Sequence, residues 1–275
     1  MAMPRKLRIG IPVLNRGDLL RRLVESVDVE AEILVVVNSI GPVDASVEDT
    51  VVELENQQRD GVRVRAEWIA GNLGVAGSWN FIMDQFGGDC VISNSDIEFS
   101  PGVLGKAMDK IESNRDTVMH HLWASSCFYV TAAFPETLGW FDENIYPAYH
   151  EDEEIRLRAA ALGVRRSTVW AIGKSGIAHG CSETRKNASE AVQAYIRKAK
   201  GLSGDYLKRR WGALPPPGIS EPEKKHPFDD PSVHPADWTL DLDARGRVAA
   251  LCKEITGFEC PIVYHRAKGG LGRCS

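Results

Sequence analysis

The sequence predicts an α/β fold: a Rossmann-like, mostly parallel sheet flanked by helices on both faces. Short apolar runs alternate with segments of helical period over the first two hundred residues, which is typical of repeated β-α-β units. Hydrophobic residues make up 43% of the 275 residues, enough to bury a full core. Because the crossover helices cover both faces, the strands between them should be continuously apolar.

The first half of the chain contains four expected β-α pairs. Predicted strands are residues 7–11, 32–37, 62–67 and 90–93. Predicted helices are residues 19–27, 46–58, 75–86 and 101–114. The first strand should end at Pro12, and Asp18 is expected to cap the first helix. Ser100 and Pro101 are the expected N-cap and first residue of the fourth helix.

The second half is less regular. Residues 128–131 predict a strand and residues 135–139 a helical turn. A helix is expected from Glu151, closed by Gly163. Two short strands are expected at 164–172 and 176–179, then a helix at 189–211 that is either continuous or broken at 201–204.

Composition changes at Pro215-Pro216-Pro217-Gly218, which predicts a boundary. We expect a main domain over residues 1–212 and a Pro-rich C-terminal extension over 213–275. Trp238 and Phe258 are the side chains expected to pack the extension against the main domain.

Charge and hydropathy exclude two classes of partner. The formal net charge is −5 with no Lys/Arg block, so nucleic acid is not an expected partner. The longest apolar run, Ile33–Val37, is too short to span a membrane. No signal-peptide pattern precedes the first strand, so a cytoplasmic protein is expected.

Two groups of carboxylates are the strongest chemical signals. The segment Asn94-Ser95-Asp96-Ile97-Glu98 follows the strand 90–93, at the edge where open α/β sheets bind ligands. Glu151 to Glu154 open a helix, and Asp152 shares a face with the apolar Ile155 and Ala159. Both groups also have a purely structural interpretation, as helix caps or as acids complementing a helix dipole.

Several polar residues add to these signals. His179 ends the short predicted strand at 176–179, where it is either a ligand or a structural histidine. Asn72, Gly74 and Asn80 surround the start of a helix, where they are either binding residues or turn and packing residues.

The order of these segments is more specific than any one of them. From Pro12-Val13-Leu14-Asn15-Arg16 to His179, the chain resembles glycosyltransferase family two, the inverting enzymes with a GT-A fold. The resemblance covers roughly residues 7–210, and the segment from Glu151 to Gly163 is its most specific part.

The resemblance implies a role for each matching residue. Asp152 would be the general base, with Glu151 beside it in the catalytic pair. Asp96 and His179 would hold Mn²⁺ or Mg²⁺. The residues implied in donor binding are Pro12, Asn15, Arg16, Asn38, Ser39, Asn72, Gly74, Asn80, Asn94 and Ser95.

The implied reaction moves a sugar from a nucleotide-diphospho-sugar, a UDP-sugar first among them, to a hydroxyl of a saccharide, glycolipid or protein. A divalent cation neutralises charge on the leaving diphosphate, and a carboxylate takes the proton of the attacking hydroxyl. Direct in-line attack inverts the anomeric centre.

Three departures from the family pattern keep alternatives open. Asn94 stands where the first acid of the D-x-D motif is expected, which favours an inactive nucleotide-sugar or carbohydrate-binding module as the alternative. Val37-Asn38 lacks the acid that often contacts uracil, so the donor base stays open. The interval from Asp96 to Asp152 is short, which suggests a reduced acceptor region. A sugar nucleotidyltransferase is disfavoured because no Gly-rich basic loop follows the first strand.

Overall fold

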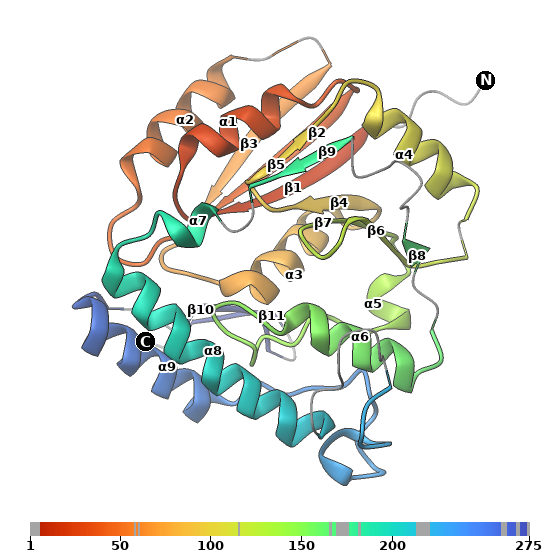
Figure 1. Ribbon diagram of the computed structural model, residues 1–275, viewed down its shortest axis with the longest axis vertical. Helices are drawn as coiled ribbons and strands as arrows, with labels where there is room; N and C mark the ends of the chain where they lie inside the picture. The colour runs from red at the N-terminus through yellow and green to blue at the C-terminus, as the bar shows by residue number, and fades with distance from the viewer. Residues whose placement is uncertain are drawn as a thin grey trace. The chain divides into compact units, whose positions relative to one another are not determined.

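The described residues form two compact units in a computed structural model (Figure 1). The first unit takes its residues from 1–70, 82–132 and 167–188, and the second from 71–81, 133–166 and 189–275. Within these ranges the structure describes residues 6–57, 59, 61–114, 116–164, 167–168, 176–180, 183–212, 221–259, 263–267 and 270–273.

A seven-stranded, mostly parallel sheet forms the first unit, with strand order β3-β2-β1-β4-β7-β6-β8. Its strands are β1 (Leu7–Val13), β2 (Ala31–Val37), β3 (Val62–Trp68), β4 (Cys90–Ser93), β6 (Met119–Trp123), β7 (Cys127–Val130) and β8 (Ser167–Thr168). β1 pairs in parallel with both β2 and β4, whereas β7 is antiparallel to β4 and β6. The predicted α/β class is therefore confirmed.

Helices of the first unit follow the predicted order. They are α1 (Gly17–Glu25), α2 (Ala45–Asn56), α4 (Val103–Glu112) and the short α7 (Glu183–Lys186), with the C-terminal part of α3 (Gly74–Phe86). Two predicted caps are wrong. Arg16, not Asp18, is the N-cap of α1, and Gly102, in a left-handed conformation that suits glycine, caps α4 in place of Ser100.

Close packing around Gly10 brings α3 down onto the sheet. A Cβ atom at Gly10 would lie 2.1 Å from Cγ2 of Ile82, so only glycine permits this approach. Ile33 of the neighbouring β2 is fully buried, as expected for a strand covered on both faces.

A second, two-stranded sheet was not predicted as such. β5 (Ile97–Phe99) pairs antiparallel with β9 (Ile177–His179), and Ile97 is opposite His179. The sequence analysis predicts β9 but no strand at residues 97–99. The predicted strand at 164–172 is described only at Ser167–Thr168, because residues 165–166 and 169–172 lie outside the described residues.

The second unit is mainly helical. Its elements are the N-terminal part of α3, α5 (Phe134–Thr137), α6 (Glu151–Ala161), α8 (Glu190–Trp211), the 3₁₀ helix η2 (Pro227–Asp229), α9 (Leu242–Thr256) and the hairpin β10 (Val263–Ala267) with β11 (Gly270–Arg273). α8 runs unbroken through residues 201–204. Within the described helices, none combines the length and apolar character needed to cross a membrane.

A buried ionic cluster joins α6 to α8. Both carboxylate oxygens of Glu154 accept hydrogen bonds from the Arg158 guanidinium. Oε1 also accepts from Arg210 Nε at 3.2 Å and from Trp211 Nε1 at 3.2 Å. Glu154, Arg158 and Arg210 have 0% exposed side chains, so each charge depends on the others for compensation.

Residues beyond the predicted boundary also form hydrogen bonds with buried groups of this unit. Arg210 Nη2 donates to the carbonyl oxygens of Pro235 and Asp237, at 2.9 and 2.8 Å. Asn144 accepts from the backbone of Asp241 at 2.7 Å. The boundary itself falls at residues 213–220, outside the described residues, so a separate extension over 213–275 stays a prediction.

The two aromatic anchors expected in residues 213–275 behave differently. Trp238 Nε1 donates to the Trp140 carbonyl oxygen at 3.1 Å, as packing against the preceding segment requires. Phe258 is 42% exposed and comes one residue after Gly257, the C-cap of α9. Phe258 is therefore not the buried anchor that the sequence predicts.

We expect Glu154→Ala to lower the free energy of unfolding by about 3–5 kcal/mol, because it leaves two guanidinium groups buried without their shared carboxylate. Chemical denaturation monitored by circular dichroism measures this. The control Glu48→Ala removes an exposed first-turn acid of α2 and should cost no more than about 1 kcal/mol. Equal losses in both variants would contradict the role of the cluster.

Candidate functional site

Asp96 and His179 lie side by side after the carboxyl end of β4. His179 Nε2 is 3.4 Å from Asp96 Oδ1, and the exposed side-chain fractions are 17% and 4%. The pairing of β5 with β9 explains this proximity, since it sets Ile97 opposite His179 and lets Gly180 N donate to the Asp96 carbonyl oxygen at 2.9 Å. The structure thus brings together the two residues predicted to hold a metal.

Gly180 is confined between two acidic side chains. A Cβ atom there would lie 2.8 Å from Cγ of Glu183 and 3.2 Å from Cβ of Asp96. Any larger residue would push Glu183 or Asp96 away from its position. Cys181 and Ser182, the next two residues in the sequence, lie outside the described residues.

Glu183 is a site residue that the sequence does not single out. It begins α7, and its Oε2 accepts from Arg16 Nη1 at 3.3 Å and from Asn187 Nδ2 at 2.9 Å. Hydrogen bonds from Asn187, Lys186 and Arg16 lower the pKa of Glu183. A carboxylate four residues after a candidate histidine was the one available signal, and it is too common to be diagnostic.

Arg16, predicted to contact the donor, is held by two carboxylates. Its backbone is left-handed, with φ 65° and ψ 67°, at the N-cap of α1. Its Nε and Nη2 atoms each donate to Asp18 at 2.6 Å. The hydrogen bonds to Asp18 raise the pKa of Arg16 and lower that of Asp18, so this cation is permanent.

The other predicted donor residues of this unit stand at or beyond strand ends. Asn38 and Ser39 are buried directly after β2, and Asn38 N donates to the Val13 carbonyl oxygen at 2.8 Å. Asn94 N donates to Ser126 at 2.7 Å directly after β4. Ser95 is also buried, whereas Pro12 and Asn15 are half-buried at the end of β1 and in the turn after it. Carboxyl ends of neighbouring parallel strands form the usual ligand edge of such a sheet.

In the second unit, Asn72, Gly74 and Asn80 have clear structural contacts. Asn72 Oδ1 accepts from Gly74 N at 2.8 Å, and Gly74 has a positive φ of 72°. Asn80 is fully buried, with its amide donating to the carbonyl of Phe141 and to Glu143 Oε1 at 2.9 and 2.8 Å. These bonds order the start of α3, and donor binding by the three residues stays a prediction.

Glu151 and Asp152 begin α6 after a strained turn. Tyr149 and His150 have φ values of 75° and 79°, a conformation costly for residues other than glycine. Asp152 is half-buried, and its Oδ1 accepts from Glu153 N at 3.0 Å. Oε2 of Glu151 is buried and makes no hydrogen bond with any described residue. Burial, and then the neighbouring Asp152, raise the pKa of Glu151 to about 8.

Comparison with known proteins identifies the family. The family model described as glycosyl transferase family 2 matches residues 8–156, more than half of the chain. The chain belongs to glycosyl transferase family 2. No curated protein sequence matches this chain.

Solved structures of glycosyltransferases share the fold of this family 2 protein. The mannosyltransferase PcManGT from Pyrobaculum calidifontis, in complex with GDP-Man and Mn²⁺, is 13% identical with a TM-score of 0.55, over 92% of this chain and 72% of that one. S. aureus TarS 1-349 in complex with UDP-GlcNAc is 12% identical with a TM-score of 0.51, over 93% and 74%. At such identities the similarity shows the GT-A fold, and the chain is a glycosyltransferase by its family.

The donor set of the family 2 domain suits a hard divalent cation. Asp96 offers a carboxylate oxygen and His179 an imidazole nitrogen, and Mg²⁺ or Mn²⁺ commonly takes one or two protein ligands with substrate phosphates completing its shell. Over the described residues, no group of three or more His, Cys, Asp or Glu side chains could hold a metal by itself. Asp96 and His179 are therefore the two described side chains of this site that fit a divalent cation.

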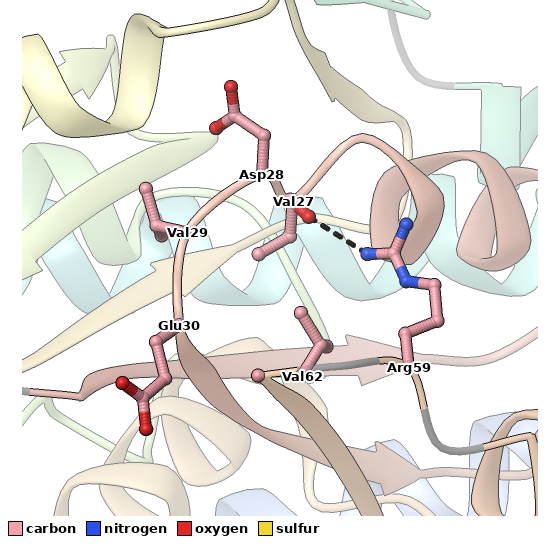
Figure 2. Close-up of a pocket in the computed structure, with 7 residues that line it drawn as sticks. Val27, Asp28, Val29, Glu30, Arg59 and Val62 are labelled. Carbon is pink, nitrogen blue, oxygen red and sulfur yellow. Dashed lines mark hydrogen bonds between the residues drawn. The ribbon is translucent and has the colours of Figure 1, made fainter.

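A separate pocket of about 420 Å³ lies at the opposite, amino end of the sheet of the first unit (Figure 2). Its lining residues are Val27, Asp28, Val29, Glu30, Arg59, Gly61 and Val62. Arg59 donates to the carbonyl oxygens of Val24, Glu25 and Val27, at 3.0, 2.9 and 2.8 Å, so its charge caps the end of α1. Loops before the strands are not the ligand edge of an open α/β sheet, so we do not place the donor here.

We expect Glu151→Gln to become more stable relative to the native protein as pH rises from about 4.5 to about 8. In this window the unfolded chain has lost the Glu151 proton while the folded chain still holds it, so the native protein loses stability with rising pH and the glutamine variant does not. Thermal denaturation across this pH range measures the difference.

Glu153→Gln is the matched control, and its stability relative to the native protein should change with pH in the opposite direction. The hydrogen bond from His150 lowers the pKa of Glu153, so its contribution is present at neutral pH and is lost as pH falls. The variant should therefore be destabilised at neutral pH and approach the native protein in acid. The same pH profile for both variants would refute the assignment for Glu151.

Proposed function

We propose that this family 2 glycosyltransferase is an inverting, metal-dependent enzyme that uses a nucleotide-diphospho-sugar, with Asp152 as the general base. The observation that carries the proposal is the Asp96–His179 pair, which follows the carboxyl end of β4 and offers oxygen and nitrogen ligands 3.4 Å apart. The carboxyl ends of the strands are where open α/β sheets bind their ligands, which supports a cation held there beside the donor diphosphate.

We assign donor binding to residues at the strand ends of the first unit. Asn38 and Ser39 follow β2, and Asn15 and Arg16 follow β1. Arg16 supplies a permanent positive charge for a diphosphate, held ready by Asp18 and Glu183. Asp96 and His179 would hold Mn²⁺ or Mg²⁺, which when bound neutralises charge on the leaving diphosphate. The GDP-Man and UDP-GlcNAc complexes of the two structural neighbours support a nucleotide-sugar donor, and the Mn²⁺ in one supports the metal.

The pKa of Glu151 assigns the roles within the pair Glu151 and Asp152, the first two of the four acids that open α6. With a pKa of about 8, Glu151 keeps its proton at neutral pH and is unable to take another. Asp152 is then the carboxylate left to act as base. It removes the proton of the acceptor hydroxyl as the oxygen attacks the anomeric carbon, and the bond from that carbon to the diphosphate oxygen breaks. The new bond forms on the face of the anomeric carbon opposite the bond that breaks, which inverts the configuration of that carbon.

The direct test is turnover of a panel of UDP-, GDP- and dTDP-sugars with Mn²⁺, followed as released nucleoside diphosphate. We expect release from at least one donor. Binding of a donor with no release, to water or to any acceptor tried, would identify the protein as the inactive binding module that Asn94 favours.

Asp96→Asn should remove the dependence of donor affinity on Mn²⁺. In the native protein we expect Mn²⁺ to strengthen donor binding at least tenfold in calorimetry, and the variant, which keeps the shape but loses the charge, should show less than a threefold effect. Asp109→Asn on α4 changes an exposed acid of the same unit and should behave as the native protein does. A tenfold Mn²⁺ effect retained in Asp96→Asn would exclude Asp96 as the ligand.

Asp152→Asn should lower nucleoside diphosphate release by ~10²-fold or more while donor affinity stays within a few-fold. Asparagine preserves the size and most hydrogen bonds but does not accept a proton at neutral pH. Asp243→Asn, in the first turn of α9, is the control for the loss of a helix-start acid and should leave the rate unchanged. A folded Asp152→Asn protein with the native rate would assign the base elsewhere.

A further inference from the structure

The exposed face of α8 carries a concentration of positive charge that the proposed reaction does not use. α8 contains six basic and two acidic residues, in a chain whose net charge is −5. Five of the basic residues are exposed, namely Arg197, Lys198, Lys200, Lys208 and Arg209, and Asp205 is the exposed acid among them. We call these five residues the basic face of α8. At 1.5 Å per residue it extends roughly 18 Å along the helix.

One edge of the basic face, at Lys200, lies against the turn that precedes Glu151 and Asp152. Lys200 Nζ is 4.7 Å from the centroid of the Tyr149 ring, two residues before Glu151. Lys200 also contributes, after His150 and Arg156, to the lowered pKa of Glu153. The ammonium is therefore held beside the first turn of α6, where Glu151 and Asp152 begin.

The same helix fixes the backbone of this turn. Ser203 Oγ donates to the Tyr146 carbonyl oxygen at 3.1 Å. Gly204 leaves room for the imidazole of His150, since a Cβ atom there would lie 3.3 Å from Nε2. These contacts support the two consecutive left-handed residues, Tyr149 and His150. α8 thus contributes to the position of the turn before the acids and also carries the Lys200 ammonium.

Two simpler explanations of the basic face account for part of it. A charged helix surface is often only a solvated face, but the sign here opposes that of the whole chain. Lys200 alone is explained by its contacts with Tyr149 and Glu153. Neither explanation covers Arg197 and Lys208, for which the described residues provide no ion pair. The Arg209 guanidinium lies 5.9 Å from the centroid of the Tyr206 ring.

We propose that the basic face of α8 binds a phosphate group on the acceptor, beside the hydroxyl from which Asp152 takes its proton. This inference rests on the proposed function, and it narrows the acceptor to one that carries a phosphate. Lys200 is the contact next to the acids. The remaining residues extend the positive surface along α8, so that a larger or repeating anion can bind there. Ammonium and guanidinium groups both suit phosphate oxygens.

The test uses the full chain and two anionic probes, with donor nucleoside diphosphate and Mn²⁺ present to fill the donor site. Glucose 6-phosphate, compared with glucose, represents a soluble anionic acceptor in calorimetry. Vesicles of 30% phosphatidylglycerol in phosphatidylcholine, compared with phosphatidylcholine alone, represent a lipid-borne one in flotation. Binding should weaken as salt rises.

Lys200→Glu and Arg197→Glu should each weaken binding of the responsive probe at least fivefold. Arg197→Glu guards against a folding defect, because no described contact ties it to the turn at Tyr149 and His150. The control Lys106→Glu, at an exposed residue of α4, makes the same change in net charge. Its affinity for the probe should stay within twofold of the native value.

A response to glucose 6-phosphate supports a soluble acceptor, and a response to the vesicles alone supports a lipid-borne acceptor. Failure of both probes, or an equal loss in Lys106→Glu, overturns the inference. Nucleoside diphosphate release from the donor panel separates the two claims. Release without anion binding leaves the proposed function intact, and anion binding that depends on α8 without release from any donor overturns only the function.

Discussion

The buried carboxylate of Glu154 is the constraint on which the second unit depends. It accepts hydrogen bonds from Arg158 of its own helix and from Arg210 and Trp211 of α8. A buried charge is tolerated only with such compensation, so α6 and α8 have little freedom to slide along one another. Glu154 is three residues from Glu151, so the ionic cluster also restrains the start of α6, where Glu151 and Asp152 lie.

The turn before α6 has a strained backbone. Tyr149 and His150 adopt left-handed backbones that glycine would adopt more easily. Contacts with α8 compensate for that strain, through Lys200 on the Tyr149 ring and the space above Gly204. Strain of this kind is stable only where the surrounding structure leaves no alternative, and here it holds a buried Glu151 carboxyl next to Asp152.

In the first unit, the three-residue strand β5 fixes the position of candidate site residues. β5 joins β9, and their register brings Asp96 against His179 although the two are far apart in the sequence. Gly180 then allows Glu183 to approach, and Glu183 holds Arg16 from the other side. Positive and negative groups of the candidate donor site are thus connected through the loop that follows His179.

Local patterns were sufficient to predict the main strands and helices. The runs Ile33–Val37 in β2 and Cys90–Ile92 in β4 are apolar because both faces of the sheet are covered, whereas β1 includes the half-buried Arg8. The helical segments α2 and α3 were also predicted from their period. β5 and β6 were missed for a physical reason. β5 has three residues with Glu98 exposed, and β6 contains two buried histidines, so neither has the composition of a strand.

By itself, the sequence determined the fold class, the family and the identity of the acids and the histidine that follow strand ends or begin a helix. These depend on short-range patterns, since strand ends and helix starts are local properties. Only the tertiary structure decided which of these groups meet, that Glu183 faces Arg16, and that burial keeps a proton on Glu151. Such properties arise from strand register and desolvation, which depend on residues distant in the chain.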